Sequence, residues 1–283
     1  MFGRIGVLYV YKVINLNYFR YMNYTVLSTK QSELLERLIV KYGQIVTSQD
    51  ILSQAKENWD YQQTKNLITK LVKNGWLVRV KNGLYAISDL SNRGFLSLSF
   101  YTVAGLLVKE SYVSFESALQ YHGMFDQLSG KTISVSLKKF KTVLLNNTEY
   151  SFIKTKEKLF FGWQEATIDN RTVHIATAEK ALIDIINFRK NKYAIDLVIE
   201  KLIEHKHNLD LALLADYLKE FSEATVKTFG FLFDLLKIDS ADIYRLAENS
   251  IKIKHSTHRM LAGDKKFNAK WRLYYDEYFD KYA

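Results

Sequence analysis

The hydrophobic pattern of residues Asp60 to Ser88, DYQQTKNLITKLVKNGWLVRVKNGLYAIS, changes its period halfway along. In the first half, apolar side chains and one threonine recur at the spacing of a single helix face: Thr64, Leu67, Ile68, Leu71 and Val72. Asn74-Gly75 follows, and such residues end a helix because they readily adopt a left-handed backbone. In the second half, apolar and polar residues alternate around Asn82-Gly83, which is a signal for a type I′ hairpin turn. The stretch therefore predicts a short amphipathic helix followed by a β-hairpin.

Two further helices are expected before this stretch. Ser28-Thr29 is suited to cap a helix from Lys30 to Tyr42, whose buried stripe is expected at Leu34, Leu35, Leu38 and Ile39. Thr47-Ser48 is suited to cap a second helix from Gln49 to Lys56. Three helices and a hairpin within residues 23–92 are typical of a winged helix-turn-helix domain, in which the third helix is the recognition helix and the hairpin is the wing.

The expected recognition helix and wing carry side chains that suit a DNA duplex. Glutamine and asparagine can donate to and accept from base edges in the major groove, and lysine can contact phosphates. Tyr61 is expected at the helix N-terminus, where bases are usually met. The predicted DNA-binding residues are Tyr61, Gln62, Gln63, Lys65, Asn66, Thr69, Lys70, Lys73, Arg79, Lys81 and Asn82. The alternative is a polar, solvated helix on a small domain that is used for protein contacts.

The overall charge points in the same direction. The chain has a formal net charge of +10 and a sequence pI near 9.4, which favours a polyanionic partner over a neutral one. Two other basic segments, residues 131–141 and 252–272, are expected to extend a DNA track, to meet an acidic partner or simply to be solvated. The chain has no cysteine, which excludes disulfides, a thiolate zinc site and a cysteine nucleophile. This composition agrees with a reducing cytoplasm, where we expect the protein to work.

The remaining sequence predicts an extension and a larger domain. Residues 1–22 are apolar and aromatic, and we expect them to be poorly structured. Three cations keep every apolar run in this extension below the roughly 20 residues of a membrane helix, so no membrane partner is expected: Arg4, Lys12 and Arg20. Residues 93–283 show short strand patterns up to Ala176 and helical patterns afterwards, ending in a helix from Lys270 to Tyr282. The predicted fold class is α+β, with an N-terminal winged helix-turn-helix followed by a larger mixed domain that has a helical C-terminal part.

Enzymatic and metal chemistry has less support. His205 with His207, and His255 with His258, are spaced like pairs of metal ligands. No H-E-x-x-H pattern accompanies them, so neither a metal nor a cofactor is expected. A nuclease is superficially suggested by a trio of residues, Asp169, Glu179 and Lys180. A simpler explanation is that Asp169 is a turn residue and that Glu179 and Lys180 lie at the start of a capped helix. The chain also lacks a Gly-rich phosphate loop and a G-x-S-x-G motif. We therefore expect a protein that is not an enzyme, with a DNA-targeted nuclease as the alternative.

Three segments, in order along the chain, resemble elements of one known family. Residues 71–87, LVKNGWLVRVKNGLYAI, have the form L-x-x-x-G-x-L-x-R-x-x-x-G-x-Y. The segment YVSFESALQYHG contains S-x-x-S-A-L-x-x-H-G, formed by Ser114, Ser117, Ala118, Leu119, His122 and Gly123. The segment TAEKALIDII carries the third element, formed by Glu179, Lys180, Ala181, Leu182 and Asp184. Together, from Thr25 to about Phe188, they resemble the abortive-infection antitoxins of the AbiEi family.

This resemblance implies a protein with two roles in a toxin–antitoxin system of phage defence. Its N-terminal domain would bind inverted repeats in its own promoter and repress the operon as a transcriptional regulator. Its larger domain would neutralise a nucleotidyltransferase-like toxin, directly or indirectly, and would aid cooperative DNA binding. The chain lacks a G-S nucleotidyltransferase signature, which fits the antitoxin and not the toxin. Two alternatives stay open, namely the nuclease and a winged-helix module that contacts only proteins.

Overall fold

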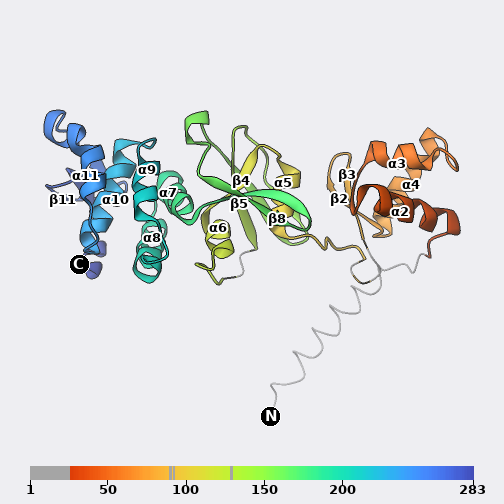
Figure 1. Cartoon of the computed structure of the whole chain (residues 1–283), viewed down its shortest axis with the longest axis horizontal. Helices are drawn as coiled ribbons and strands as arrows, with labels where there is room; N and C mark the ends of the chain where they lie inside the picture. Colours follow the sequence, from red (N-terminus) through yellow and green to blue (C-terminus); the bar gives the residue numbers. More distant parts are fainter. Residues whose placement is uncertain (1–25, 89–90, 92, 128–129) are drawn as a thin grey trace, which may run out of the picture. The chain divides into compact units, whose positions relative to one another are not determined.

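The computed structural model describes residues 26–88, 91, 93–127 and 130–283, and the predicted extension at residues 1–22 lies outside them. The chain divides into two compact units, Met1–Leu98 and Ser99–Ala283 (Figure 1). The predicted domain boundary lies at residue 92, and the structural division follows Leu98. Both helices and sheets are present, so the fold class is α+β. Across the described residues, none of the helices combines the length and the apolar character needed to cross a lipid bilayer.

Unit 1 combines helices with one small antiparallel sheet. In chain order its described elements are α2 (Thr29–Tyr42), β1 (Ile45–Thr47), α3 (Ser48–Ala55), α4 (Tyr61–Lys73), β2 (Leu77–Lys81) and β3 (Leu84–Ile87). The strand order is β1-β3-β2, so the short strand after α2 pairs with the second strand of the hairpin. Each of the three helices begins with a reciprocal capping box, in which the N-cap side chain and the third helical residue satisfy each other's backbone N–H groups.

The core of unit 1 forms between the helices and one face of this sheet. It contains Leu34, Leu35, Leu38, Val46, Ile51, Ala55, Leu67, Ile68, Leu71, Trp76, Leu77, Tyr85 and Ile87. The prediction that Ile39 belongs to the buried stripe is wrong, because its side chain is 45% exposed. Ile39 follows Leu38 directly and is therefore rotated by about 100° around the helix axis, away from the core face.

The hairpin turn also differs from the prediction. Gly83 has φ of +73°, whereas Asn82 is absent from the residues with positive φ, and the strand register shifts between Arg79 and Lys81. A type I′ turn needs positive φ at both central residues, so this turn is of another type. The backbone N–H of Ser48 donates to the carbonyl of Gly83 at 2.9 Å, which fastens the turn to the start of α3.

Unit 2 contains a mixed six-stranded sheet in the order β6-β7-β5-β4-β9-β8. Its strands are β4 (Ser111–Val113), β5 (Lys131–Ser136), β6 (Val143–Leu145), β7 (Thr148–Lys154), β8 (Trp163–Ile168) and β9 (Arg171–Ala176). The pairs β5–β7 and β4–β9 are parallel, and the other neighbours are antiparallel. Helix α5 (Phe100–Leu107) precedes these strands, and α6 (Phe115–Tyr121) and the 3₁₀ turn η1 (Glu157–Leu159) lie between them along the chain.

Helices dominate the part of unit 2 that follows the sheet. They are α7 (Ala178–Phe188), α8 (Lys192–His205), α9 (Leu211–Leu218), α10 (Glu223–Leu235) and α11 (Ala241–Glu248), followed by a π-helical turn, η2 (Asn249–Ile253). One buried cluster joins these helices to the large sheet. In Figure 1 they form the cyan-to-blue half of unit 2, next to the green strands.

The C-terminal end is not the helix that the sequence predicts for Lys270 to Tyr282. A second sheet forms there in the order β10-β12-β11, from β10 (His258–Arg259), β11 (Lys266–Asn268) and β12 (Leu273–Tyr275), and a 3₁₀ helix, η3 (Glu277–Tyr282), ends the chain. Trp271, Leu273 and Tyr275 are buried, whereas the residues between them are half-buried. Burial of every second residue is typical of a strand, so the prediction of a helix here is wrong.

Candidate functional site

Helix α4 presents the predicted DNA-binding residues on its outer face. Thr64, Leu67, Ile68 and Leu71 are buried and face the core of unit 1. Every predicted contact residue on this helix is exposed: Tyr61, Gln62, Gln63, Lys65, Asn66, Thr69, Lys70 and Lys73. The amphipathic pattern of the sequence therefore gave the correct orientation of the helix.

The hairpin extends this exposed basic surface. Arg79 and Asn82 are exposed, Lys81 is half-buried, and the guanidinium of Arg79 donates to the side-chain oxygen of Asn82 at 2.7 Å. From Tyr61 to Ser88 the chain has no aspartate or glutamate. Within the described part of the chain, no ion pair involves Lys65, Lys70, Lys73 or Arg79. We call these four side chains the cationic face.

Two of the amide side chains on α4 have different surroundings. The amide nitrogen of Gln62 donates to the side-chain oxygen of Asn66 at 3.3 Å, one helical turn further on, and both side chains face solvent. The side-chain oxygen of Gln63 instead accepts from the backbone N–H of Asp60 at 3.0 Å and completes the capping box. A bidentate contact with adenine uses both ends of the amide. The cap therefore competes with base contact at Gln63, and not at Gln62.

Two further contacts order the start of this face. The ammonium group of Lys65 lies 4.2 Å from the centre of the Tyr61 ring, and the Thr69 hydroxyl donates to the carbonyl of Lys65 at 3.0 Å. A cation over an aromatic ring is held by the ring quadrupole, which favours one orientation of the lysine stem. Because the Thr69 hydroxyl already donates to a carbonyl of the helix, its methyl group is the part of the side chain that remains for contacts with a partner.

Carboxylates of unit 1 gather elsewhere. Glu33 and Glu36 are exposed on α2, and Arg37 of the same helix forms an ion pair with Glu57. Asp60 caps α4 at the edge of the cationic face. The residues from Tyr61 to Ser88 thus carry positive charges only, whereas the rest of unit 1 carries charges of both signs.

Unit 2 contains a polar cluster that the sequence analysis did not anticipate as a cluster. Tyr112, Ser114, Lys180 and Asp184 are all 0% exposed. The ammonium of Lys180 donates to the Tyr112 hydroxyl at 2.7 Å and forms an ion pair with Asp184. The hydroxyls of Ser114 and Tyr112 donate to the second oxygen of Asp184 at 2.8 and 3.1 Å. Every partner of the carboxylate is therefore supplied by the interior, as a buried charge requires.

Burial dominates the electrostatics of this cluster. It raises the pKa of Asp184 and lowers the pKa of Lys180, while the attraction between the two charges opposes both shifts. Burial, followed by the charge of Asp184, also raises the pKa of the Tyr112 hydroxyl well above its ordinary value. The hydroxyl therefore stays protonated and can donate to the carboxylate.

The cluster joins two of the three segments that carry the family resemblance. In the first of these two segments, Ser111–Val113 form β4 and α6 begins at Phe115. Ser114 stands at the N-cap position of α6, but its hydroxyl bonds Asp184 of α7 and makes no cap bond. Farther along, a ring nitrogen of His122 lies 2.8 Å from the carbonyl of Ala176, next to the TAEKALIDII segment. Polar contacts thus join these two segments in the folded protein.

The three residues that suggested a nuclease each have a separate structural partner. The Asp169 carboxylate accepts from the backbone N–H of Ser99 at 2.8 Å, and Glu179 accepts from the backbone N–H of Asp210 at 2.9 Å. Lys180 belongs to the buried cluster. Over residues 26–283, apart from those whose placement is undescribed, no three His, Asp or Glu side chains are grouped as a metal site would need.

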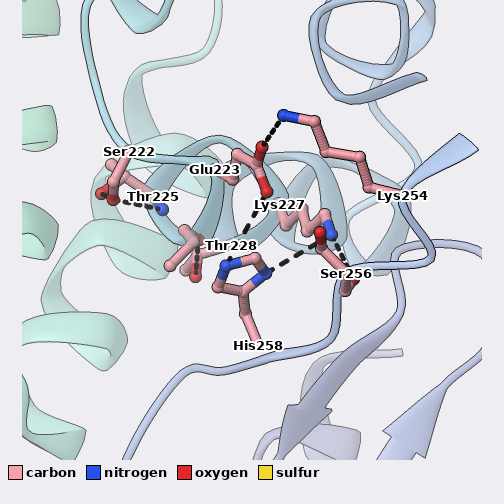
Figure 2. A network of polar contacts seen from close by, with 9 residues as sticks. Ser222, Glu223, Thr225, Lys227, Thr228, Lys254, Ser256 and His258 are labelled. Carbon is pink, nitrogen blue, oxygen red and sulfur yellow. Dashed lines mark hydrogen bonds and ion pairs between the residues drawn. The ribbon is translucent and has the colours of Figure 1, made fainter. Parts of the chain in front are cut away.

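A second buried lysine lies in α10. Lys227 is 0% exposed and donates to the carbonyl of Ser256 at 2.6 Å, and its nitrogen lies 3.4 Å from Nδ1 of His258. Glu223 lies 3.9 Å from the other ring nitrogen of His258 and 3.5 Å from Lys254 (Figure 2). Burial lowers the pKa of both Lys227 and His258, and the Lys227 charge adds to the effect on the histidine. This network ties α10 to the segment that leads into β10.

Several lysines of the two other basic segments form ion pairs with neighbouring carboxylates. In residues 131–141, Lys131 pairs with Glu149 and Lys138 with Glu110. In residues 252–272, ion pairs join Lys252 to Glu248, Lys254 to Glu223, Lys266 to Asp280 and Lys270 to Asp234. This differs from the cationic face of unit 1, where no such ion pairs form.

Comparisons with known proteins show the fold and little else. No protein-family model matches the chain, and no curated protein matches its sequence. Among solved structures, the chain is similar to the RV2827C protein from Mycobacterium tuberculosis, with a TM-score of 0.62 and 14% sequence identity. The match covers 88% of this chain and 92% of that one, so the likeness in fold extends over most of both chains.

Proposed function

We propose that unit 1 is a winged helix-turn-helix domain that binds double-stranded DNA. Helix α4 would lie in the major groove, and the β2–β3 hairpin would be the wing that contacts the backbone or the minor groove. The order of elements supports this, because helices α2, α3 and α4 precede a hairpin whose sheet is completed by β1.

One observation carries the proposal, namely the cationic face that runs from α4 to the hairpin without a carboxylate. Lysines that form no ion pair within the described residues are available to displace counterions from phosphates. The amides of Gln62 and Asn66 lie on the same exposed side and can donate and accept at base edges. Gln63 and Thr69 have bonds within the helix, so we assign them to shaping the helix and not to reading bases.

We further propose that the protein is the antitoxin of a toxin–antitoxin system and represses its own operon, without enzymatic activity. This rests on the resemblance to the AbiEi antitoxins, and the nucleotidyltransferase-like toxin is the partner that the resemblance implies. Support comes from the buried cluster, because Ser114, Lys180 and Asp184 of two separate motif segments meet there. The positions that carry the resemblance are thus linked in space as well as in order.

The DNA-binding proposal is tested by titrating the full-length protein onto the DNA upstream of its own gene, over a series of salt concentrations. We expect Lys65→Ala with Lys70→Ala to weaken binding and to reduce the slope of log affinity against log salt by about 2, because each lysine contacts one phosphate. Lys30→Ala with Lys56→Ala is the matched control, since both lysines are exposed in unit 1 outside α4 and the hairpin. Equal binding by the α4 variant and the wild type would defeat the assignment.

The antitoxin proposal needs a separate test. Co-expression with the product of the adjacent gene, scored for rescue of growth, measures neutralisation directly. Rescue by the Lys65→Ala, Lys70→Ala variant is expected when the larger domain acts independently of DNA binding. Growth arrest that wild-type protein does not relieve would contradict the antitoxin role and leave the DNA-binding proposal standing.

A further inference from the structure

A hollow of about 540 Å³ lies in unit 2 where the sheet meets the helices. Its walls come from the end of β7, the turn into η1, the end of α7 and the connection between α9 and α10. The lining residues are Lys154, Thr155, Lys156, Lys158, Leu159, Asn187, Phe188, Glu220 and Ser222. The volume is within the range of small-molecule sites, which is about 300–1,000 Å³.

The rim of the hollow is predominantly positive. Lys154, Lys156 and Lys158 are exposed, and within the described residues none of them forms an ion pair. Glu220 is the carboxylate among the lining residues. These lysines differ from those of residues 252–272, most of which have an acidic partner. A rim of unneutralised ammonium groups attracts an anion, and phosphate is the anion that lysine commonly binds in proteins.

A buried hydroxyl in the wall lacks a partner. Thr155 is 7% exposed, and among the described residues its hydroxyl has no hydrogen-bond partner. Its backbone N–H donates to the carbonyl of Ser136 at 2.9 Å, which fixes the strand end between Lys154 and Lys156. The hydroxyl oxygen is itself shielded from solvent, so a ligand in the hollow would meet the lysines on either side of Thr155 and not this hydroxyl.

The opposite wall adds a helix N-terminus and an apolar surface. Ser222 caps α10 by accepting from the N–H of Thr225, and the Thr225 hydroxyl donates to the side chain of Asn187 at 3.3 Å. Figure 2 shows Ser222 and Thr225 together at this end of the helix, whose dipole also favours an anion. Leu159 and Phe188 are half-buried and supply apolar surface beside these polar groups.

We infer that this hollow binds a nucleotide, either free or as the terminal residue of an RNA strand. The phosphate contacts Lys154 and Lys156, and the base packs against Leu159 and Phe188. A nucleotide combines the two chemistries that the walls offer, an anionic group and a flat, largely apolar ring. This site is separate from the cationic face of unit 1 and does not depend on DNA binding there.

The test titrates the full-length protein with each of the four nucleoside 5′-monophosphates by calorimetry, with inorganic phosphate and adenosine as partial ligands. We expect at least one nucleotide to bind roughly tenfold or more tightly than either partial ligand, because only the nucleotide engages both walls. Lys154→Glu with Lys156→Glu is expected to weaken nucleotide binding at least roughly tenfold, since charge-assisted hydrogen bonds to phosphate are lost.

The matched control is Lys139→Glu with Lys141→Glu, which makes the same change in charge at exposed lysines outside the hollow. Its affinity for nucleotide should equal that of the wild type, and equal weakening in the control would overturn the site. Absence of nucleotide binding, or inorganic phosphate binding as tightly as every nucleotide, would also overturn it. A short single-stranded RNA distinguishes the two sources: tighter binding than the monophosphate, with the same loss in Lys154→Glu, Lys156→Glu, assigns the site to an RNA end.

Discussion

Helices α4 and α7 place their lysines in opposite environments. The lysines of α4 are exposed, and their neighbours along the chain include no carboxylate. Lys180 of α7 is 0% exposed, and its ammonium group meets Asp184 and the Tyr112 hydroxyl. Lysine thus has a different role in each of the two helices. An exposed, unpaired charge is available to a partner, whereas a buried, paired charge is committed to the fold.

The difference follows from how much of each helix is covered. Helix α4 buries one stripe against a small core, so the rest of its surface faces solvent. Helix α7 is buried on every side from Ala178 to Ile186, so a lysine within it has no route to water and needs a carboxylate one turn away. The comparison predicts that lysine substitutions cost folding free energy in α7 and binding free energy in α4.

The largest expected effect is that of Lys180→Met. We expect it to destabilise unit 2 by roughly 3–5 kcal/mol, because it leaves the buried Asp184 carboxylate without its cation. The measurement is urea unfolding of the full-length protein, fitted with a separate transition for each unit. Lys70→Met in α4 is the matched control and should stay within about 0.5 kcal/mol of the wild type.

A double variant sharpens this prediction. Lys180→Met with Asp184→Leu removes both charges, so it should be less destabilised than Lys180→Met alone. A Lys180→Met protein as stable as the Lys70→Met protein would break the comparison, since a buried lysine would then cost nothing to remove.

The sequence predicted unit 1 better than unit 2, and particular residues show why. The exposed face of α4 follows from a local helical pattern, and the α4 cap at Asp60 lies three residues from its partner Gln63. The bond between Ser114 and Asp184 joins residues 70 positions apart, and no local pattern encodes that distance. Both residues belong to the motif segments, but only the packing of α6 against α7 shows that they are in contact.

Two other differences come from local choices that tertiary structure decides. The segment from Trp271 to Tyr275 has both helical and alternating features, and pairing of β12 with β10 and β11 selects the strand. The Asn82-Gly83 pair predicted a hairpin correctly, but Asn82 lacks the positive φ that a type I′ turn needs. No sequence pattern singles out the three lysines at and after the end of β7, because the hollow that they line forms only when the sheet and the helices pack together.

Neighbouring glutamines of α4 provide a test of intermediate size. Gln62→Ala should reduce the discrimination between the preferred operator and a base-substituted one by about 1–3 kcal/mol, with little change in stability. Gln63→Ala should lower the stability of unit 1 by about 0.5–1 kcal/mol through loss of its cap bond, and leave that discrimination unchanged. Paired binding titrations and thermal unfolding of both variants measure the two effects.

The reverse pattern would contradict the separation of roles on α4. If Gln63→Ala relaxes specificity and Gln62→Ala does not, the capping bond opens when DNA binds, and exposure in the free protein does not identify the reading residues. If neither variant affects specificity, the bases are read elsewhere on the cationic face.

The smallest expected effect concerns the second buried lysine, Lys227, through its neighbour His258. Burial, together with the Lys227 charge, lowers the pKa of His258 below its ordinary value of 6.5 in the folded protein. The unfolded chain therefore takes up a proton first as the pH falls. Stability from this group is present above pH 6.5 and is lost as the pH falls through the folded-state pKa. Glu223 stays ionised in this window because its own pKa is lowered, so it limits the size of the effect.

Thermal unfolding at pH 7.5 and 5.5 measures this dependence. We expect unit 2 of the wild type to lose stability between the two values, and His258→Gln to show a smaller loss, because a neutral amide takes up no proton. His207→Gln is the control, since His207 is exposed and should leave the pH dependence of the wild type intact. An unchanged pH dependence in His258→Gln would show that Lys227 and its neighbours relax when the histidine is protonated. The buried lysine of α10 would then resemble the adaptable lysines of α4 more than the fixed Lys180.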